Sequence, residues 1–172
     1  MPGKNLAAEF RIEPLNSRHD RAGFHCGVAE LDEWLQQRAG QDQKRNLAAV
    51  FVLTRDGTSV AGFYSLSAHS IVAAELPLAH STKLPRFPLP VTLLGRMAVA
   101  ESKQGRGLGE HLLIHALERA LTGSRQIASW AVIVDAKAGA RDFYLKHDFI
   151  PFPNRPERLF IAMKTIEALF RE

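Results

Sequence analysis

The chain has 172 residues, of which 46% are hydrophobic and 23% charged, and this composition is typical of an ordinary globular domain. Its length predicts one domain over residues 1–172, and its single cysteine, Cys26, excludes an intrachain disulfide framework. The N-terminal segment lacks the apolar stretch of a signal peptide, and the longest apolar run, residues 47–53, is too short to cross a membrane. We therefore expect a cytoplasmic protein without a membrane segment. The net charge of +4 indicates an anionic partner.

The first half of the chain predicts strands around one helix. Residues 10–14 are expected to form a strand, and residues 29–39 carry apolar side chains at helical spacing. Residues 46–54 and 60–67 predict a β-hairpin, because the turn dipeptide Asp56-Gly57 lies between them. Four prolines within residues 75–90 predict an irregular loop rather than a helix.

The second half predicts alternating strands and helices. An apolar strand over residues 91–100 leads into a glycine-rich loop, which opens a helix that Gly123 is expected to end. A buried strand is expected at residues 130–134 and a helix with Phe143 and Tyr144 at residues 138–147. Two final strands, at residues 149–152 and 159–163, are expected on either side of a loop that contains Pro153 and Pro156.

The glycine-rich loop, residues 104–109, predicts an anion site. Backbone N–H groups at a helix start have no intrahelical partner, and the helix dipole is positive there. Glycines at positions 105, 107 and 109 remove side chains that would keep a phosphate away, so we expect a cofactor that carries a diphosphate. The loop lacks the Gly-Lys-Ser/Thr of a P-loop, and Glu110 occupies the place of the last glycine of a dinucleotide fingerprint. The alternative is a plain glycine turn.

The spacing Gln104-x-x-Gly107-x-Gly109 resembles the coenzyme A pyrophosphate loop of the GNAT acetyltransferases, and the order of elements over residues 91–164 resembles the core of that family. The resemblance implies an α/β (α+β) GNAT fold, with about four helices around a mostly antiparallel mixed sheet. This sheet has six to seven strands and splays apart between strands 4 and 5. Acetyl-CoA is the implied cosubstrate. Its pantetheine arm and pyrophosphate would be bound, respectively, by the main chain of Met97, Ala98 and Val99 and by that of Gln104, Gly105, Arg106, Gly107, Leu108 and Gly109.

The same resemblance implies that Tyr144 is the catalytic residue. The matching tyrosine of GNAT enzymes lies beside the thioester sulfur and acts as a general acid. A phenol with a pKa of roughly 10 keeps its proton at neutral pH and can protonate a departing thiolate. The alternative is a tyrosine that packs its helix against the sheet, which is also what we expect of Phe143.

The strand at residues 91–100 carries no carboxylate that could act as a general base. An α-amino group, with a pKa of about 7.7–8.0, needs less help in losing a proton than a lysine, at about 10.4. The missing base therefore favours an α-amine, although another strand could supply one. Arg96 interrupts this apolar strand, and we expect it either to position the substrate or to pair with Asp135.

Three further residues carry chemistry that we do not assign to the site. His111 and His115 lie one helical turn apart, as metal ligands often do, but no third ligand is evident, so we expect no metal. Cys26 follows a histidine without a visible relay partner and is expected to be a packed thiol.

Seven short motifs, spread over residues 10–165, together resemble the GNAT toxins of type II toxin–antitoxin modules. They are Phe24-x-Cys26-Gly27, Leu31-Asp32-x-Trp34-Leu35, Gly62-Phe63-Tyr64-x-Leu66-Ser67, Leu94-Gly95-Arg96-Met97-Ala98-Val99, Val134-Asp135-Ala136, Phe143-Tyr144 and Arg158-Leu159-Phe160. This resemblance implies acetylation of the α-amino group of aminoacyl-tRNA, which blocks translation. It also implies a ribbon-helix-helix antitoxin and a homodimer. The alternatives are an acetyltransferase for a small amine or a protein N-terminus, and a coenzyme A-binding module without activity. Lys44 and Arg45 could contact the RNA backbone or be solvated.

Overall fold

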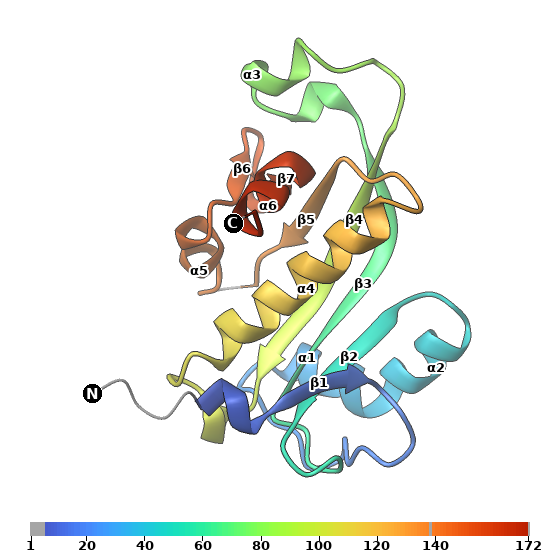
Figure 1. Cartoon of the computed structure of the whole chain (residues 1–172), viewed down its shortest axis with the longest axis vertical. Coiled ribbons are helices and arrows are strands. Elements are labelled where there is room, and N and C mark those ends of the chain that lie inside the picture. Colours follow the sequence, from blue (N-terminus) through green and yellow to red (C-terminus); the bar gives the residue numbers. More distant parts are fainter. Residues whose placement is uncertain (1–5, 138, 172) are drawn as a thin grey trace. The chain divides into compact units, whose positions relative to one another are not determined.

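The structure, a computed structural model, describes residues 6–137 and 139–171, with side chains from residue 8 onward (Figure 1). The chain divides into two compact units, each built from two stretches of sequence. The first unit contains the residues up to Ser67 together with Arg96–Ala116, and the second contains Ala68–Gly95 together with the residues from Leu117 on. The single domain expected for residues 1–172 remains a prediction.

Seven strands form one mixed sheet in the order β1-β2-β3-β4-β5-β7-β6. The strands are β1 (Arg11–Pro14), β2 (Ala49–Thr54), β3 (Gly62–Ile71), β4 (Leu89–Val99), β5 (Ala131–Asp135), β6 (Ile150–Phe152) and β7 (Arg155–Ala162). The helices are α1 (Ala29–Glu33), α2 (Ala39–Lys44), α3 (Leu78–Ser81), α4 (Leu108–Ser124), α5 (Arg141–Lys146) and α6 (Met163–Leu169). Short turns of other helix types are η1 (Leu6–Glu9), η2 (Trp34–Arg38), η3 (Ala73–Glu75) and η4 (Glu101–Lys103). The predicted fold class is confirmed.

The first unit holds the predicted hairpin. β2 pairs antiparallel with β3, from Ala49 opposite Leu66 to Leu53 opposite Gly62, and β1 pairs antiparallel with the other edge of β2. Every residue of β2 after Ala49 is buried, as expected of a central strand rich in β-branched and aromatic residues. The hairpin prediction is confirmed.

The helix predicted to end at residue 39 continues to Lys44 through the π-helical turn η2. Side-chain hydrogen bonds hold this last part in place. The Trp34 indole N–H donates to Asp42 at 2.9 Å, while the Gln43 side chain donates to the Leu15 carbonyl and accepts from the Val50 N–H. Apolar periodicity does not report such bonds, so the predicted end was wrong by five residues.

The second unit contains a parallel pair of strands. Residues Thr92–Leu94 of β4 pair in parallel with Val132–Val134 of β5, and β5 and β6 both pair antiparallel with β7. Pro156 was expected in the loop before β7, but it lies within that strand. The β6–β7 pairing shifts its register beside this point, so a residue without an N–H removes no regular ladder bond there.

Two further expectations for the second unit were wrong, and one helix was missed. Residues 75–90 contain the one-turn helix α3, since Pro77 with φ of −56° precedes it and its carbonyl accepts from the His80 N–H at 2.9 Å. Gly123 lies inside the last turn of α4 rather than after it. Helix α6 was not predicted at all, because Met163 and Ile166 are its buried positions and two positions do not make a clear period.

Each unit has its own hydrophobic core. In the first, Phe24, Trp34 and Phe63 pack together with ring centroids 5.5 and 5.9 Å apart, in a cluster that Ala98 of β4 also contacts. In the second, Phe152, Phe160 and Ile133 belong to a separate cluster. Over the described ranges, no helix is both long enough and apolar enough to span a bilayer.

Candidate active site

The glycine-rich loop lies in the first unit, between η4 and α4. Gly105 and Gly107 have φ of +78° and +81°, a backbone region that is costly for residues with a Cβ atom. The Gln104 side chain holds the loop in place, because its amide donates to the carbonyls of Val99 and Cys26, both at 2.9 Å. Sequence reasoning assigned Gln104 only a main-chain role and missed this bridge, since a pattern of spacings does not indicate side-chain partners.

The loop presents a row of unused main-chain donors. Its residues from Gln104 to Gly107 are exposed, and α4 begins directly after them at Leu108. The first helical bond of this turn is donated by the His111 N–H to the Gly107 carbonyl at 3.1 Å. Within the described part of the chain, the N–H groups of residues 105–110 have no acceptor. Consecutive free N–H groups at the start of a 17-residue helix suit a bound anion.

Met97, Ala98 and Val99 are half-buried residues of β4, in its first-unit half. The strand is held close to β3 here, because a Cβ atom at Gly62 would lie 2.9 Å from the Ala98 carbonyl oxygen. The next residue, Ala100, donates its N–H to the Ala61 carbonyl at 2.8 Å. Main-chain contacts with β3 therefore help to fix the strand that precedes the loop.

Tyr144 lies on α5 in the second unit. Its ring is 5% exposed and packs against Phe143 and Phe149, with centroids 5.2 and 5.3 Å away, so burial raises the pKa of this phenol. Within residues 8–137 and 139–171, its hydroxyl has no hydrogen-bond partner, and no fully buried side-chain nitrogen or oxygen lacks one. The hydroxyl must therefore reach the protein surface. The ring of Tyr144 is packed among its neighbours, as the alternative to a catalytic role expected. Its hydroxyl is nevertheless free to donate a proton.

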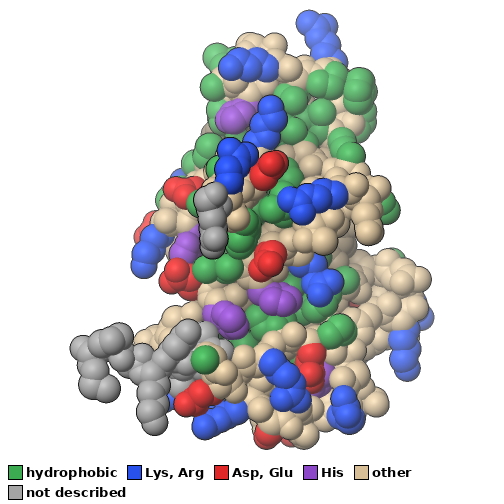
Figure 2. Space-filling view, viewed as in Figure 1, with side chains coloured by type: hydrophobic (Ala, Val, Ile, Leu, Met, Phe, Trp, Pro, Cys, Tyr) green, Lys and Arg blue, Asp and Glu red, His purple; other side chains and the backbone are tan. Residues whose placement is uncertain are grey.

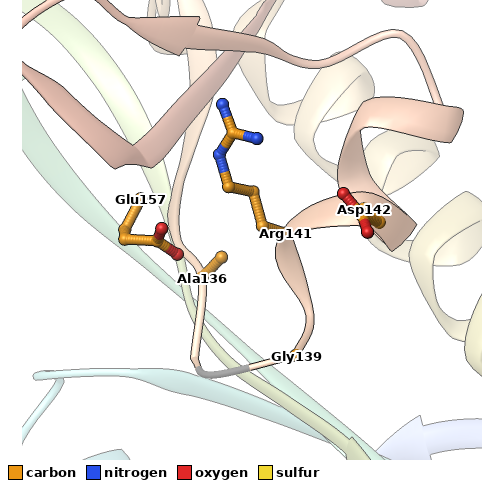
Figure 3. Close-up of a pocket in the computed structure, with 5 residues that line it drawn as sticks. All are labelled: Ala136, Gly139, Arg141, Asp142 and Glu157. Atoms are coloured by element: carbon orange, nitrogen blue, oxygen red, sulfur yellow. The ribbon is translucent and has the colours of Figure 1, made fainter.

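A pocket of about 470 Å³ opens at the start of α5 (Figure 3). Its lining includes Ala136 and Glu157 on one side and Gly139, Arg141 and Asp142 on the other. Arg141 lies between Glu157 and Asp142 in Figure 3, and its Nε donates to the Pro156 carbonyl at 2.8 Å. Arg141 is the first residue of α5, and Tyr144 follows three residues later on the same helix. The pocket is therefore lined by a cationic side chain from the helix that carries the phenol. No motif singled it out, because a lone arginine before an aromatic pair has no distinctive spacing.

Arg96 does not have a carboxylate partner among the described residues. Its guanidinium lies over the Trp34 ring, 4.2 Å from the centroid, and burial lowers its pKa although the nearby Asp42 charge opposes this. Asp135, the alternative partner, instead accepts two hydrogen bonds from Arg158 at 2.7 and 2.8 Å. Pairing of Arg96 with Asp135 was therefore wrong, because Arg158 faces Asp135 across the β5–β7 ladder.

His115 binds a tyrosine in this structure. Its Nδ1 lies 2.7 Å from the hydroxyl of Tyr64, a fully buried residue on β3. Within the ranges that the structure describes, no group of three or more His, Cys, Asp or Glu side chains could hold a metal ion. Cys26 is a buried thiol whose pKa is raised to about 11 by burial and by the neighbouring Asp32, as expected of a packed residue.

Basic side chains do not form one field on the visible face. In Figure 2, lysine and arginine are scattered among apolar and acidic side chains. Lys44, Arg45 and Arg106 are all exposed, as the solvated alternative expects. The free main-chain N–H groups of the glycine loop are therefore the candidate anion site of the first unit.

A mixed sheet with one parallel pair, a glycine loop of free N–H groups after β4, and a buried tyrosine with a free hydroxyl are the features of an acyl-transfer enzyme that binds an anionic cofactor. A family model described as an acetyltransferase (GNAT) domain matches residues 46–151, and the chain belongs to this family. It is thus a GNAT acetyltransferase, an enzyme class that uses acetyl-CoA.

Relatives from two bacteria resemble nearly the whole chain. A tRNA-acetylating toxin of Mycobacterium tuberculosis is 37% identical over 90% of this chain and 93% of its own length. A probable toxin TacT of Sinorhizobium fredii is 34% identical over 95% of this chain and 96% of its own.

Two solved structures of the toxin AtaT are also similar. The first, in complex with acetyl-methionyl-tRNAfMet, is 28% identical with a TM-score of 0.87 and covers 94% of this chain and 99% of that one. The second, a mutant bound to the C-terminus of the antitoxin AtaR and acetyl-CoA, is 26% identical with a TM-score of 0.82. It covers 95% of this chain and 99% of that one.

Proposed function

We propose that this chain is a toxin that transfers the acetyl group of acetyl-CoA to the α-amino group of aminoacyl-tRNA and thereby blocks translation. The observation that carries the proposal is the likeness to a tRNA-acetylating toxin at 37% identity over 90% of the chain. The missing carboxylate on β4 supports it further. An aminoacyl ester has an α-amine that is partly neutral at physiological pH and needs no strong base.

The proposed division of roles follows the two units. In the first, the main chain of residues 104–109, whose N–H groups are free from residue 105 on, binds the pyrophosphate of acetyl-CoA. The main chain of residues 97–99 bonds its pantetheine amides. Arg106 adds a charge to the phosphates. In the second, Tyr144 donates its proton to the coenzyme A thiolate when the tetrahedral intermediate collapses.

Arg96 is the proposed substrate residue of the first unit. Its guanidinium is half-buried and stacked on Trp34 without an ion-pair partner among the described residues, so it retains its hydrogen-bond donors for a ligand. Because the carboxyl group of an aminoacyl-tRNA is esterified, the anionic groups of that substrate are its phosphates. We propose that Arg96 helps to position the acceptor end through one of them.

The proposed partners follow from the same likeness. An antitoxin would neutralise the toxin, and the solved complex of a similar toxin with the C-terminus of the antitoxin AtaR supports such a partner. Its ribbon-helix-helix type is part of the proposal and rests on the sequence resemblance alone. The active form is proposed to be a cytoplasmic homodimer. Light scattering of the purified chain, alone and after co-expression with the product of the adjacent gene, tests both assemblies.

The test of the function is an acetyl-transfer assay with labelled acetyl-CoA. Aminoacylated tRNA, deacylated tRNA, a panel of small amines and peptides with free N-termini are offered to the wild-type chain. We expect label in aminoacyl-tRNA, recovered as N-acetylamino acid after ester hydrolysis. Label that enters only small amines or peptides would favour the alternative acetyltransferase, and binding of acetyl-CoA without any transfer would favour the inactive module.

A further inference from the structure

A second cavity, of about 690 Å³, lies within the second unit between α3 and the start of α6. Its lining combines aromatic rings, lysines and hydroxyls, from His80, Lys83, Ser129, Trp130, Lys164 and Thr165. None of these residues has a role in the proposed transfer of the acetyl group. The cavity is larger than the pocket at α5 and is built from three separate stretches of the chain.

The charge of this cavity is positive. Lys83 and Lys164 are both exposed, and neither forms an ion pair with a residue that the structure describes. Among the described residues, the lining contains no aspartate or glutamate to compensate them. Two uncompensated ammonium groups at one cavity favour an anionic ligand.

The aromatic wall of the cavity is firmly held. The half-buried Trp130 stacks on Phe160, with centroids 5.6 Å apart and planes at 29°. The His80 ring meets both of them edge-on, at 5.9 and 5.3 Å. Trp130 also lines the cavity, and the part of its ring that Phe160 does not cover is a surface that a nucleobase can contact in any sequence context.

The main-chain groups of Trp130 and Met163 at the cavity are already paired. The Trp130 N–H donates to the Pro90 carbonyl at 2.7 Å, and the Met163 N–H donates to the Trp130 carbonyl at 2.8 Å. The Ser129 hydroxyl bonds to Thr92 at 2.9 Å. A peptide that binds by strand addition needs free main-chain groups, whereas a nucleotide can be recognised by rings and charges alone.

We propose that this cavity binds one nucleotide of the RNA substrate, with its phosphate at Lys83 and Lys164 and its base against Trp130. The proposal rests on the proposed function, which supplies an RNA ligand. It assigns the second unit a role in holding the tRNA as well as in protonating the leaving thiolate.

The first test measures binding of deacylated tRNA to the full chain at several salt concentrations. Lys83→Glu and Lys164→Glu should each raise the dissociation constant severalfold and lower the slope of log affinity against log salt by about one. Arg18→Glu is the matched control. It reverses one charge at an exposed turn outside the cavity and should change both quantities much less.

The second test uses the fluorescence of Trp130. The chain has two tryptophans, and the other, Trp34, is 5% exposed. Added tRNA should quench the emission of the wild type, and Trp130→Phe, which keeps an aromatic ring for stacking, should remove most of the quenching without unfolding the chain. Any remainder comes from Trp34, on which Arg96 stacks. Polyglutamate serves as an anion without bases and should leave the emission nearly unchanged.

The outcomes separate the two proposals. If the wild type acetylates aminoacyl-tRNA but both lysine variants bind tRNA as Arg18→Glu does, the nucleotide site is refuted and the proposed function stands. Quenching by polyglutamate equal to that by tRNA would also refute it, in favour of an acidic protein partner. A wild type that neither binds nor acetylates tRNA would overturn both.

Discussion

The two tyrosines of the chain allow the role of Tyr144 to be tested against an internal control. Tyr144→Phe removes one oxygen atom from a buried ring and leaves its contacts with Phe143 and Phe149 in place. Because the hydroxyl has no hydrogen-bond partner among the described residues, its removal should change the free energy of unfolding by less than about 0.5 kcal/mol. The loss should fall on catalysis instead.

The expected loss in kcat is that of a general acid. Removing such a group costs about 10²- to 10⁴-fold, which corresponds to about 3 to 5 kcal/mol of transition-state stabilisation. The dissociation constant for acetyl-CoA should be nearly unchanged, since a proton donor to the leaving thiolate acts after the cofactor is bound. The assay is the rate of label transfer to aminoacyl-tRNA at saturating acetyl-CoA, with unfolding in urea measured in parallel.

Tyr64→Phe removes the same atom from the other tyrosine. There the hydroxyl of the buried Tyr64 lies 2.7 Å from the half-buried His115, so its loss leaves a ring nitrogen without this partner. We expect a destabilisation of about 1 to 3 kcal/mol and a kcat within a few-fold of the wild type. If Tyr144→Phe keeps full activity, or if both variants lose activity only in proportion to stability, the assignment of Tyr144 as the acid is refuted.

The pH dependence provides a further check on Tyr144. Burial raises the pKa of this phenol above its unfolded value of about 10, so the proton is retained across the neutral range. The resulting contribution to stability is fully present below the unfolded pKa and is lost as pH rises through the folded pKa. Activity should therefore rise with pH through the pKa of the attacking amine and should not fall again below about pH 10. A decline near pH 8 would assign the proton to another group.

Other predictions concern packing, the cofactor loop and one ion pair. Gly62→Ala should cost about 1 to 3 kcal/mol in urea unfolding, because its Cβ would lie 2.9 Å from the Ala98 carbonyl oxygen; an unchanged midpoint would contradict this. Gly107→Ala, at φ of +81°, should strain the loop by about 1 to 2 kcal/mol and raise the dissociation constant for acetyl-CoA in calorimetry. Hydrogen bonds from Arg158 lower the pKa of Asp135, so their stabilisation is present above the unfolded pKa of about 3.9 and lost as pH falls. Asp135 is 49% exposed, so Asp135→Asn should destabilise by at most about 1 kcal/mol at pH 7, a difference that should vanish in acid.

Periodicity and turn signals predicted those elements well whose local sequence has a clear pattern. The hairpin of β2 and β3, the glycine loop and α4 follow from local patterns that no distant contact overrides. Elements that depend on distant partners were missed or misplaced. The last turn of α2 is held by the Gln43 side chain, which bonds to Leu15 and Val50, and no window of sequence contains all three residues.

The features of the candidate site were likewise predictable only where they follow from the local sequence. Main-chain donors at residues 104–109 follow from a glycine spacing, which a reader of the sequence can see. The two faces of Tyr144, a packed ring and a free hydroxyl, follow from where its neighbours lie and could not be inferred from the Phe-Tyr pair alone. The same holds for Arg96, whose partner is the Trp34 ring rather than the carboxylate that its charge suggests.

The absence of a base on β4 connects these observations with the choice of substrate. β4 contains no aspartate or glutamate, and Glu101, the next carboxylate along the chain, is exposed on η4. Without a base on β4, attack is favoured for amines that are already neutral. At pH 7, a lysine with a pKa of about 10.4 is neutral in only about one molecule in a thousand. An α-amine with a pKa near 7.7–8.0 is neutral in about one molecule in ten. Amine selectivity can therefore arise from the protonation equilibrium of the acceptor, and the protein has only to position it.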